Sequence, residues 1–297
     1  MRGPRRWRSR PGKAGSDAKA AEAARAAFAL EAGRFTPYVA LEREGAIFFL
    51  STESKFGRRL FSTRELKDGR QLARALRALE LAGLERAGGT FVDVGANVGT
   101  STVQALTEHG FTAGVACEAE AGNFRILKAN LAVNGVDGVV RAFNLAVSNR
   151  SGEGVLRFRG RGSQTHYLVR DGEAAEDTVA VRVTTLDDLA AEIGLDPAEA
   201  GLLWIDVEGF ELEVLEGARS FLRRAVPLVV EFVPNRYPGE RLQALVDVLS
   251  PAYTHFVDLK PSRPARHGLE PLSTIETLLA RRRDKTDILV FRLPEPS

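Results

Sequence analysis

The segment 90–110, TFVDVGANVGTSTVQALTEHG, constrains the fold of this chain more than any other part of the sequence. It starts with a short apolar run, continues through a turn from Gly95 to Gly99, and ends in a helical stretch closed by Gly110. Such a run predicts a buried strand, and a glycine at this point is typical of a helix C-terminus. Strand, tight turn and helix predict the opening of a βαβ unit, whose helix N-terminus offers free N–H groups to an anionic ligand.

The glycine spacing favours one cofactor over another. A dinucleotide fingerprint reads G-x-G-x-x-G, whereas three residues separate Gly95 from Gly99. We expect both glycines to let the backbone approach the ligand, because a Cβ would keep it away. S-adenosylmethionine has no pyrophosphate but carries an ammonium group and a ribose diol, so its turn needs an acceptor such as Asp93. The next apolar run ends at Glu118, whose carboxylate can accept both ribose hydroxyls. This pair predicts S-adenosylmethionine and disfavours an NAD-dependent oxidoreductase.

Composition excludes several classes of function. The 297 residues carry a formal net charge of +2, and much of the surplus lies near the start, so the core gives no electrostatic reason to bind nucleic acid. The single cysteine, Cys117, excludes an internal disulfide and a cysteine-based metal cluster; its predicted strand makes it a core residue. No apolar run approaches the length of a membrane span, and the basic start lacks the apolar segment of a secretory signal. The resulting expectation is a cytoplasmic enzyme.

Three regions follow one another along the chain. Residues 1–17 are rich in Arg, Pro and Gly and are expected to form a disordered basic leader. Residues 18–64 are expected to form an extension, with an alanine-rich helix and a small hairpin at 38–50. Residues 65–297 are the predicted main domain, which begins with an amphipathic helix across one end of the sheet.

The main domain keeps a rhythm of strands and helices. Further strands are predicted at 112–117, 138–144, 202–207, 227–234, 253–258 and 287–292, and helices at 123–134, 186–193, 209–221 and 241–249. Between 152 and 185, two alternating segments predict an inserted antiparallel pair. They flank a polar loop, 160–176, which contains His166 and is a candidate lid or acceptor-binding element.

Acidic residues mark the carboxyl ends of four predicted strands. They are Asp93, Glu118, Asp206 and Glu231, with Glu208 just beyond the third of these. In an open parallel sheet, ligands bind outside the carboxyl ends of the strands. We therefore expect these carboxylates to share one cleft.

Asn144 ends the strand predicted at 138–144, and Ala146 follows it two residues later. Asn144 and Ala146 lie at its carboxyl end, the edge of the sheet at which ligands bind. We therefore expect both to line the adenine side of the cleft.

Several motifs in the same order make the chain similar to the FkbM family of S-adenosylmethionine-dependent methyltransferases. They are FVDVGANVGTSTVQ, CEAEAGNFRILKANLAVNG, LLWIDVEGFELEVLEGARSFL and PLVVEFVP, and they fall within residues 90–234. The resemblance implies an α/β class I methyltransferase fold, a Rossmann-like three-layer sandwich. Its sheet would be seven-stranded and mostly parallel, with an antiparallel last strand. The resemblance also implies methylation of a hydroxyl group on a sugar or a small natural product.

By position, the resemblance implies a role for each part of the site. The residues that would hold the methionine end of the cofactor are Asp93, Gly95, Asn97 and Gly99. Glu118 would hold the ribose, Ala146 would lie near the adenine, and the segment 206–211 would lie beside the sulfonium and the acceptor. Two positions depart from the family pattern: Trp204 replaces a common lysine, and Ala119 replaces a common proline.

The expected chemistry is proton removal from an alcohol that is held in line for displacement. Asp206 is the first candidate for general base, with Glu208 and Glu231 in support, and it also counts among the cofactor-binding residues. His166 is an alternative base. The three carboxylates also offer the oxygen ligands that Mg²⁺ prefers, so Asp206 is equally a candidate metal ligand and Mg²⁺ an alternative second cofactor.

Two other functions stay open. One is a nucleic-acid or nitrogen-directed methyltransferase; against it stand the near-neutral core and the D-V-E-G sequence in place of an N-P-P-Y motif. The other is a non-catalytic module of this fold in a biosynthetic complex, against which stand the intact Asp93, Gly95, Gly99 and Glu118. The expected partner is a small-molecule or glycan acceptor, with no nucleic acid and no membrane. The sequence does not indicate an oligomeric state.

Overall fold

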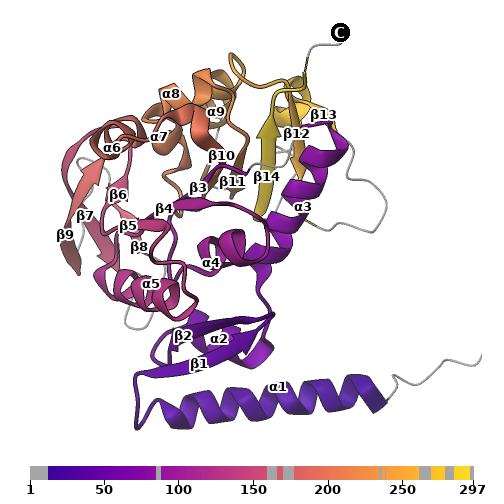
Figure 1. The fold of residues 1–297 in the computed structure, drawn as a ribbon, viewed down its shortest axis with the longest axis vertical. Helices are drawn as coiled ribbons and strands as arrows, with labels where there is room; N and C mark the ends of the chain where they lie inside the picture. The colour runs from indigo at the N-terminus through magenta and orange to yellow at the C-terminus, as the bar shows by residue number, and fades with distance from the viewer. Residues whose placement is uncertain are drawn as a thin grey trace, which may run out of the picture.

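The computed structural model describes residues 13–84, 88–158, 166–169, 177–233, 236–237, 239–260, 269–277 and 284–294. These residues form an eight-stranded sheet, a four-stranded sheet and a two-stranded hairpin (Figure 1). None of the helices in the described part of the chain combines the length and the hydropathy needed to traverse a bilayer.

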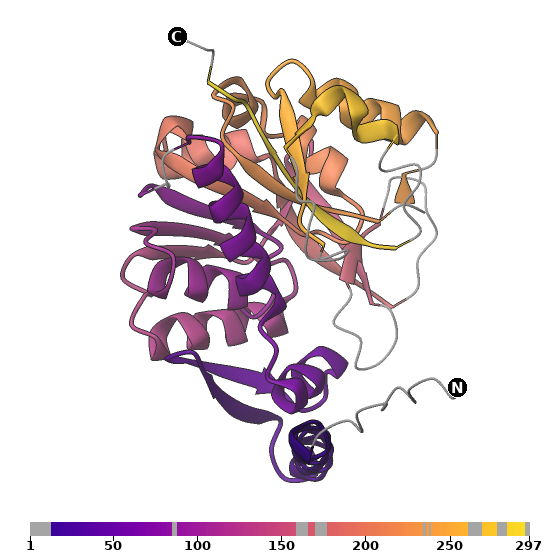
Figure 2. The same ribbon diagram turned by 90° about the vertical axis from the view of Figure 1, so that its right-hand side faces the viewer.

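The N-terminal region lies at one end of the molecule's long axis (Figures 1 and 2). Helix α1 (Lys13–Ala32) begins inside the stretch expected to be a disordered leader, and residues 1–12 lie outside the described residues. Strands β1 (Tyr38–Arg43) and β2 (Ala46–Ser51) pair antiparallel, which confirms the predicted hairpin. Helix α2 (Lys55–Thr63) was not predicted; the Ser54 hydroxyl caps it by accepting the Gly57 N–H at 3.0 Å.

Two asparagines one helical turn apart fasten this hairpin to the main domain. On helix α5 (Ala121–Val133), Asn130 accepts the Phe49 N–H at 2.6 Å, and Asn134, just after the helix, accepts the Ile47 N–H at 2.9 Å. Asn130 also donates to the Val98 carbonyl oxygen at 2.8 Å, so it links strand β2 to the glycine turn. The hairpin is therefore packed onto the domain that carries the glycine turn.

The central sheet has the strand order β13-β12-β14-β11-β10-β3-β4-β5. In chain order its strands are β3 (Thr90–Val94), β4 (Ala113–Cys117), β5 (Val140–Phe143), β10 (Ala200–Ile205), β11 (Leu228–Phe232), β12 (His255–Asp258), β13 (Glu270–Pro271) and β14 (Thr286–Phe291). Strands β3, β4, β5, β10 and β11 run parallel, and β14 is antiparallel to β11 and β12. This topology confirms the predicted class I methyltransferase sheet with its antiparallel last strand, to which β13 adds a short eighth strand.

Helices cover both faces of the sheet, which gives the predicted three layers. One face carries α3 (Lys67–Leu81), α4 (Thr100–Thr107) and α5, whose apolar residues pack on Phe91, Ala116 and Leu202 of the sheet. The other face carries α6 (Leu186–Ile193), α7 (Glu211–Glu216), α8 (Arg219–Arg223) and α9 (Glu240–Leu249). Helix α3 thus covers a face of the sheet rather than one end.

The helix predicted at 209–221 is divided into α7 and α8 near Gly217. A Cβ on Gly217 would lie 2.1 Å from the Ser148 carbonyl oxygen. The chain there passes too close to a neighbouring backbone for a larger residue.

The inserted segment forms a four-stranded sheet of order β6-β9-β7-β8. Its strands are β6 (Ala146–Val147), β7 (Gly152–Phe158), β8 (His166–Leu168) and β9 (Thr178–Thr184), and the antiparallel pairing of β7 with β9 confirms the predicted pair. Of the expected polar loop 160–176, only 166–169 lie within the described residues.

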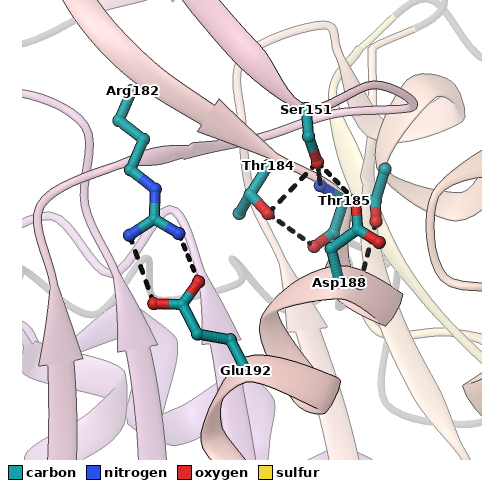
Figure 3. Close-up of polar contacts among 6 residues, drawn as sticks. All are labelled: Ser151, Arg182, Thr184, Thr185, Asp188 and Glu192. Carbon is teal, nitrogen blue, oxygen red and sulfur yellow. Dashed lines mark hydrogen bonds and ion pairs between the residues drawn. The ribbon is translucent and has the colours of Figure 1, made fainter.

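Polar contacts join this small sheet to helix α6 (Figure 3). Arg182 of β9 pairs with Glu192 of α6, and Ser151 donates to Asp188 of the same helix. Thr185 caps α6 by accepting the Asp188 N–H at 2.9 Å. Because α6 packs into the core of the central sheet, these contacts hold the small sheet in place beside the carboxyl ends of the main strands.

Candidate active site

The alternation of side chains along the strands brings the strand-end carboxylates to one face of the sheet. On β3, β10 and β11, the residue two positions before each acid is Phe91, Trp204 or Val229, and all three pack under α3 and α4. Since residues i and i+2 of a strand point to the same face, the acids that follow them, Asp93, Asp206 and Glu231, belong to that face. Ala116 and Glu118 on β4 follow the same rule.

A cavity of about 1190 Å³ opens at this edge of the sheet. Its lining includes five residues predicted to bind the cofactor, Gly95, Asn97, Glu118, Ala146 and Asp206, together with the candidate catalytic residues Glu208 and His166. Three other predicted cofactor residues, Asp93, Gly99 and Asn144, are not among the residues that line it. The cavity exceeds the range of about 300–1,000 Å³ typical of one small ligand, so its size is consistent with a cofactor and an acceptor together.

Glu118 is a buried carboxylate in one part of the cavity, which we call the cofactor half after the role predicted for its residues. Its two oxygens accept the backbone N–H groups of Asn97 (2.9 Å) and Glu120 (2.8 Å), which ties the glycine turn to the end of β4. Burial raises the pKa of Glu118 to about 7, although these two hydrogen bonds and a third from the Asn123 side chain favour its ionised form. A carboxylate has about four lone-pair sites, so Glu118 keeps capacity for a ligand hydroxyl.

Asp93 lies behind the cavity wall rather than in it. Its Oδ2 accepts the hydroxyls of Ser101 (2.6 Å) and Thr102 (2.5 Å), so Asp93 fixes the first turn of α4, and Ser101 is the residue that lines the cavity. Burial raises the pKa of Asp93 to about 6. Its Oδ1 is buried and has no hydrogen-bond partner among the described residues.

The two glycines of the turn are needed because of contacts within the protein. A Cβ on Gly95 would lie 1.9 Å from the Asp206 carbonyl oxygen, and one on Gly99 would lie 2.5 Å from Leu127 Cδ1. Both glycines have positive φ, of 91° and 85°. A Cβ would therefore meet the chain just after strand β10, or helix α5. That the two glycines also let the backbone approach the ligand stays a prediction.

Replacement of Gly95 with alanine is therefore expected to lower the free energy of unfolding by more than the strain of the left-handed backbone, which is about 1–2 kcal/mol. Gly110 is the matched control, because it has a φ of 78° but no atom within 4 Å of an added Cβ. Urea unfolding of both variants measures the difference. Equal losses for Gly95→Ala and Gly110→Ala would contradict the close approach of the turn to Asp206.

Other predicted residues take different positions around the cofactor half. Asn144 donates to the carbonyl oxygens of Glu118 (2.9 Å) and Ala119 (3.0 Å) and so holds the chain after β4. Ala146 lines an apolar end of the cavity, where Leu156 and Leu168 of the small sheet also lie. Such an end is suited to an adenine ring.

His166 lies on β8 and lines the cavity. Partial burial lowers its pKa, and the charged side chain that opposes this is Glu120, the N-cap residue of α5.

The other part of the cavity, called the acceptor half after the role predicted for it, lies at a cluster of three carboxylates with one oxygen from each within 4.8 Å of the others. Asp206 and Glu208 line the cavity, and Glu231 is buried behind them. Arg236 pairs with Glu208 and lies 3.5 Å from Glu231, and Lys285 pairs with Glu231. The oxygen donors suit Mg²⁺, but two of them already contact cationic side chains. We therefore derive no step through a metal.

The pKa of Asp206 lies well above the ordinary value of a carboxyl group. Burial raises its pKa to about 8, the ammonium of Lys285 lowers it, and the negative charges of Glu208, Asp287 and Asp68 raise it. Asp287, on β14 opposite Glu231, is also buried, with a pKa raised to about 6. The acceptor half therefore contains a carboxyl group whose proton exchanges near neutral pH.

Sequence reasoning missed three residues that complete this half: Lys285, Asp287 and Gln71. Gln71 of α3 donates to Asp287, and Lys285 precedes β14. One signal in the sequence could have located two of them. Lys285 lies just before the strand predicted at 287–292, and Asp287 begins it. An antiparallel last strand presents its first residues, not its last, at the ligand-binding edge.

The residues present fit the implied S-adenosylmethionine in three respects. Asn97 Oδ1 is a buried acceptor without a partner among the described residues, on a wall of the cavity. Asn97 (φ 52°) and Glu208 (φ 55°) are both cavity-lining residues in the left-handed region, a conformation that costs energy and concentrates at functional sites. The Glu118 carboxylate and the apolar end next to Ala146 line the same cavity.

Comparison with known proteins places this arrangement in a family. A search of curated proteins gave no match. The FkbM methyltransferase from Methylobacillus flagellatus KT has 17% identity and a TM-score of 0.46, with 79% of this chain and 52% of that one covered. This chain thus spans about half the length of that relative.

Two further solved structures have lower identity. The M. jannaschii TYW2 in complex with AdoMet shows 12% identity and a TM-score of 0.41 over 86% of this chain and 85% of that one. A tRNA methyltransferase of M. jannaschii shows 8% identity and a TM-score of 0.42 over 88% and 58%. That nucleic acid is not an acceptor stays a prediction.

The sequence itself gives the assignment. The model of the methyltransferase FkbM domain matches residues 93–257, more than half of the 297-residue chain. The match runs from Asp93, near the end of β3, to β12, and it includes Glu118, Asp206 and Glu231. The protein therefore belongs to the FkbM methyltransferase family.

Proposed function

We propose that the protein is an S-adenosylmethionine-dependent O-methyltransferase that acts on a hydroxyl of a sugar or a small natural product. The observation that carries this proposal is one continuous cavity with two chemically different halves. One half offers buried acceptors and an apolar end around Glu118, and the other holds the carboxylate cluster around Asp206. A donor and an acceptor alcohol need these two environments side by side.

Bound S-adenosylmethionine would supply a methyl group on a sulfonium centre. Glu118 would accept the ribose hydroxyls. Asn97 and Ser101, in the first turn of α4, would face the methionine end. The apolar wall near Ala146 would contact the adenine. Asp93 would contribute by holding Ser101 and Thr102 at the start of α4.

Asp206 is proposed to accept the proton of the acceptor hydroxyl. A carboxylate with a pKa near 8 binds that proton more strongly than an ordinary carboxylate does, and its pKa lies near the working pH. Lys285 keeps a fraction of Asp206 ionised, because its ammonium stabilises the carboxylate. Glu208 and Glu231 would hold Arg236 and Lys285 in place.

The affinity for S-adenosylhomocysteine is expected to rise with pH between about 5.5 and 8. Glu118 has a pKa of about 7, and hydroxyl donors favour its ionised form, so binding below pH 7 releases a proton. The dissociation constant would fall by up to about tenfold per pH unit below that pKa. Titration calorimetry in two buffers of different ionisation heat measures the released proton; a pH-independent affinity would contradict the role of Glu118.

The free energy of unfolding of the ligand-free protein should receive a contribution that falls, rather than rises, with pH. Asp93 and Glu118 have folded-state pKa values above the reference values of 3.8 and 4.5. Between pH 4.5 and pH 6, the folded chain thus holds protons that the unfolded chain has released. The contribution of these two groups to the free energy of unfolding falls as the pH rises through this window.

A mass-spectrometric screen tests the reaction. The full chain is incubated with S-adenosylmethionine and pooled glycosides and polyketide alcohols, with and without EDTA. The expected product gains one methyl on oxygen. A methyl on nitrogen would overturn the assignment, and loss of activity with EDTA would restore a metal to the carboxylate cluster. Heat of S-adenosylmethionine binding without any product would favour the non-catalytic alternative.

A further inference from the structure

Helix α3 presents a basic stripe to the mouth of the cavity. Lys67, Arg70 and Arg74 occupy positions i, i+3 and i+7, which lie on one side of a helix, and all three line the cavity. Arg59 of α2 and Lys260 after β12 line the same cavity. We call these five residues the cationic rim. The N-terminal extension and helix α3 thus supply most of the positive charge around the acceptor half.

Helix α3 is held in this position by contacts along its length. Thr100 at the start of α4 donates to Asp68 at 2.8 Å, Gln71 donates to Asp287, and Arg74 donates to the Leu259 carbonyl oxygen at 3.2 Å. The helix therefore crosses from the glycine turn to the ends of β12 and β14. This path sets the cationic rim beside the carboxylate cluster.

Depth separates the two signs of charge in the acceptor half. Glu231 and Asp287 are buried and Asp206 is half-buried, whereas Arg59, Lys67 and Arg70 are exposed. The most buried charges of the acceptor half are thus acidic, and most of the exposed charges that line the cavity are basic, although Glu65 and Asp284 are exposed acids. A ligand that enters meets mainly positive charges first.

Most of the positive charge of the rim is not neutralised by strong ion pairs. Among the described residues, Arg59 and Lys67 have no ion pair, and Arg70 meets Glu65 only at 3.5 Å on the surface. Lys260 meets the exposed Asp284 at 3.3 Å. Exposed pairs of this kind contribute about 0–1 kcal/mol, so they would yield to a better anionic partner.

We propose that the acceptor is a small molecule with both a hydroxyl and an anionic group, a phosphate or a carboxylate. The anionic group binds the cationic rim, and the hydroxyl lies at Asp206. This inference rests on the proposed function and names its substrate class. Guanidinium groups match phosphate and carboxylate oxygens in a bidentate fashion. The buried acids repel a second negative charge, so only one orientation of such an acceptor is favourable. Acids such as Glu65 and Asp284 interrupt the rim, which favours a small anion over a polynucleotide.

Calorimetric titration of the S-adenosylhomocysteine-loaded full chain tests the rim. The probes are inorganic phosphate and the matched trio glucose, glucuronate and glucose 6-phosphate. We expect phosphate to bind, and glucose 6-phosphate and glucuronate to bind at least about tenfold more tightly than glucose at low salt. The two charged sugars distinguish a phosphate from a carboxylate requirement. The double variant Arg70→Gln/Arg74→Gln should lose this preference.

Arg77→Gln is the matched control. It lies on the same helix, forms an ion pair with Glu80 at 2.7 Å, and does not line the cavity. The inference is overturned if inorganic phosphate does not bind. It is equally overturned if Arg77→Gln lowers the affinity for phosphate as much as the double variant does. It is also overturned if mixed tRNA binds in place of phosphate and depends on Arg70 and Arg74.

Failure of this inference can be told from failure of the proposed function. An enzyme that methylates a neutral acceptor, with kcat/KM unchanged in the double variant, keeps the proposed function and loses the anionic acceptor. A chain that binds no S-adenosylhomocysteine loses the proposed function, whatever the phosphate titration shows.

Discussion

Asp206→Asn is expected to lower kcat for methyl transfer by about 10²–10⁴-fold and to change the affinity for S-adenosylhomocysteine little. Asparagine keeps the shape of the side chain but cannot accept the proton of the acceptor hydroxyl. The backbone contact of residue 206, an N–H that donates to the Val94 carbonyl oxygen at 3.0 Å, is kept in the variant. The cavity should therefore stay assembled while the base is absent.

The pH profile separates a base from a merely structural residue. In the wild type, kcat should rise with pH up to about 8, because deprotonation of Asp206 produces the active form. Asp206→Asn should lose that dependence, and Lys285→Met should move it to higher pH, because the ammonium of Lys285 lowers the pKa of Asp206. Asp247→Asn, an exposed carboxyl on α9, is the control. An unchanged pH profile in Asp206→Asn would transfer the role to another group, with His166 the first to test.

Glu118→Gln is expected to weaken S-adenosylhomocysteine binding by about 30–100-fold, which corresponds to about 2–3 kcal/mol for the loss of hydrogen bonds to a charged acceptor. The buried carboxylate already accepts two backbone N–H groups and has lone pairs left for the ribose hydroxyls. An amide offers one oxygen instead of two, so it cannot satisfy the turn and the ligand together. Titration calorimetry at pH 8 gives the dissociation constants.

Glu120→Gln is the matched control for this variant. Glu120 lies two residues away and caps α5 by accepting the N–H groups of Gly122 (2.8 Å) and Asn123 (2.6 Å), and it does not line the cavity. Its loss should lower the thermal stability but leave the affinity within about threefold, less than 1 kcal/mol. If both variants lose the same affinity, the effect comes from the fold around β4 and not from a contact with the ribose.

The order of elements and the cofactor turn could be predicted from the sequence, because both depend on local patterns. Short apolar runs followed by glycine or acid indicate buried strands wherever they stand, and the parallel strands bring their carboxyl ends to one edge. Glu118 and Asp206 could therefore be expected in one cleft from the sequence alone. The antiparallel last strand came from the family resemblance, and the strand pairing confirms it.

Other features depend on contacts between distant segments and were not predicted. Helix α2 is amphipathic but only nine residues long, and so short a pattern does not by itself distinguish a helix from other structure. The role of Asn144 in holding the Glu118 backbone depends on a contact across 26 residues. Asp93 was expected to touch the ligand, yet its carboxylate lies behind Ser101, since Ser101 and Thr102 stand where the first turn of α4 meets β3.

By itself, the sequence determined a three-layer α/β domain of the FkbM methyltransferase family, with carboxylates at successive strand ends, because alternation and glycine spacing act over a few residues. Only the tertiary structure decided which charges surround those carboxylates. Lys285 reaches Glu231 from the far end of the chain, and the basic stripe of α3 reaches the cavity mouth from the N-terminal side. Electrostatic fields depend on distance in space and not on separation along the chain. The charges at the entrance of the cavity, which bear on the choice of acceptor, therefore emerge only after the chain has folded.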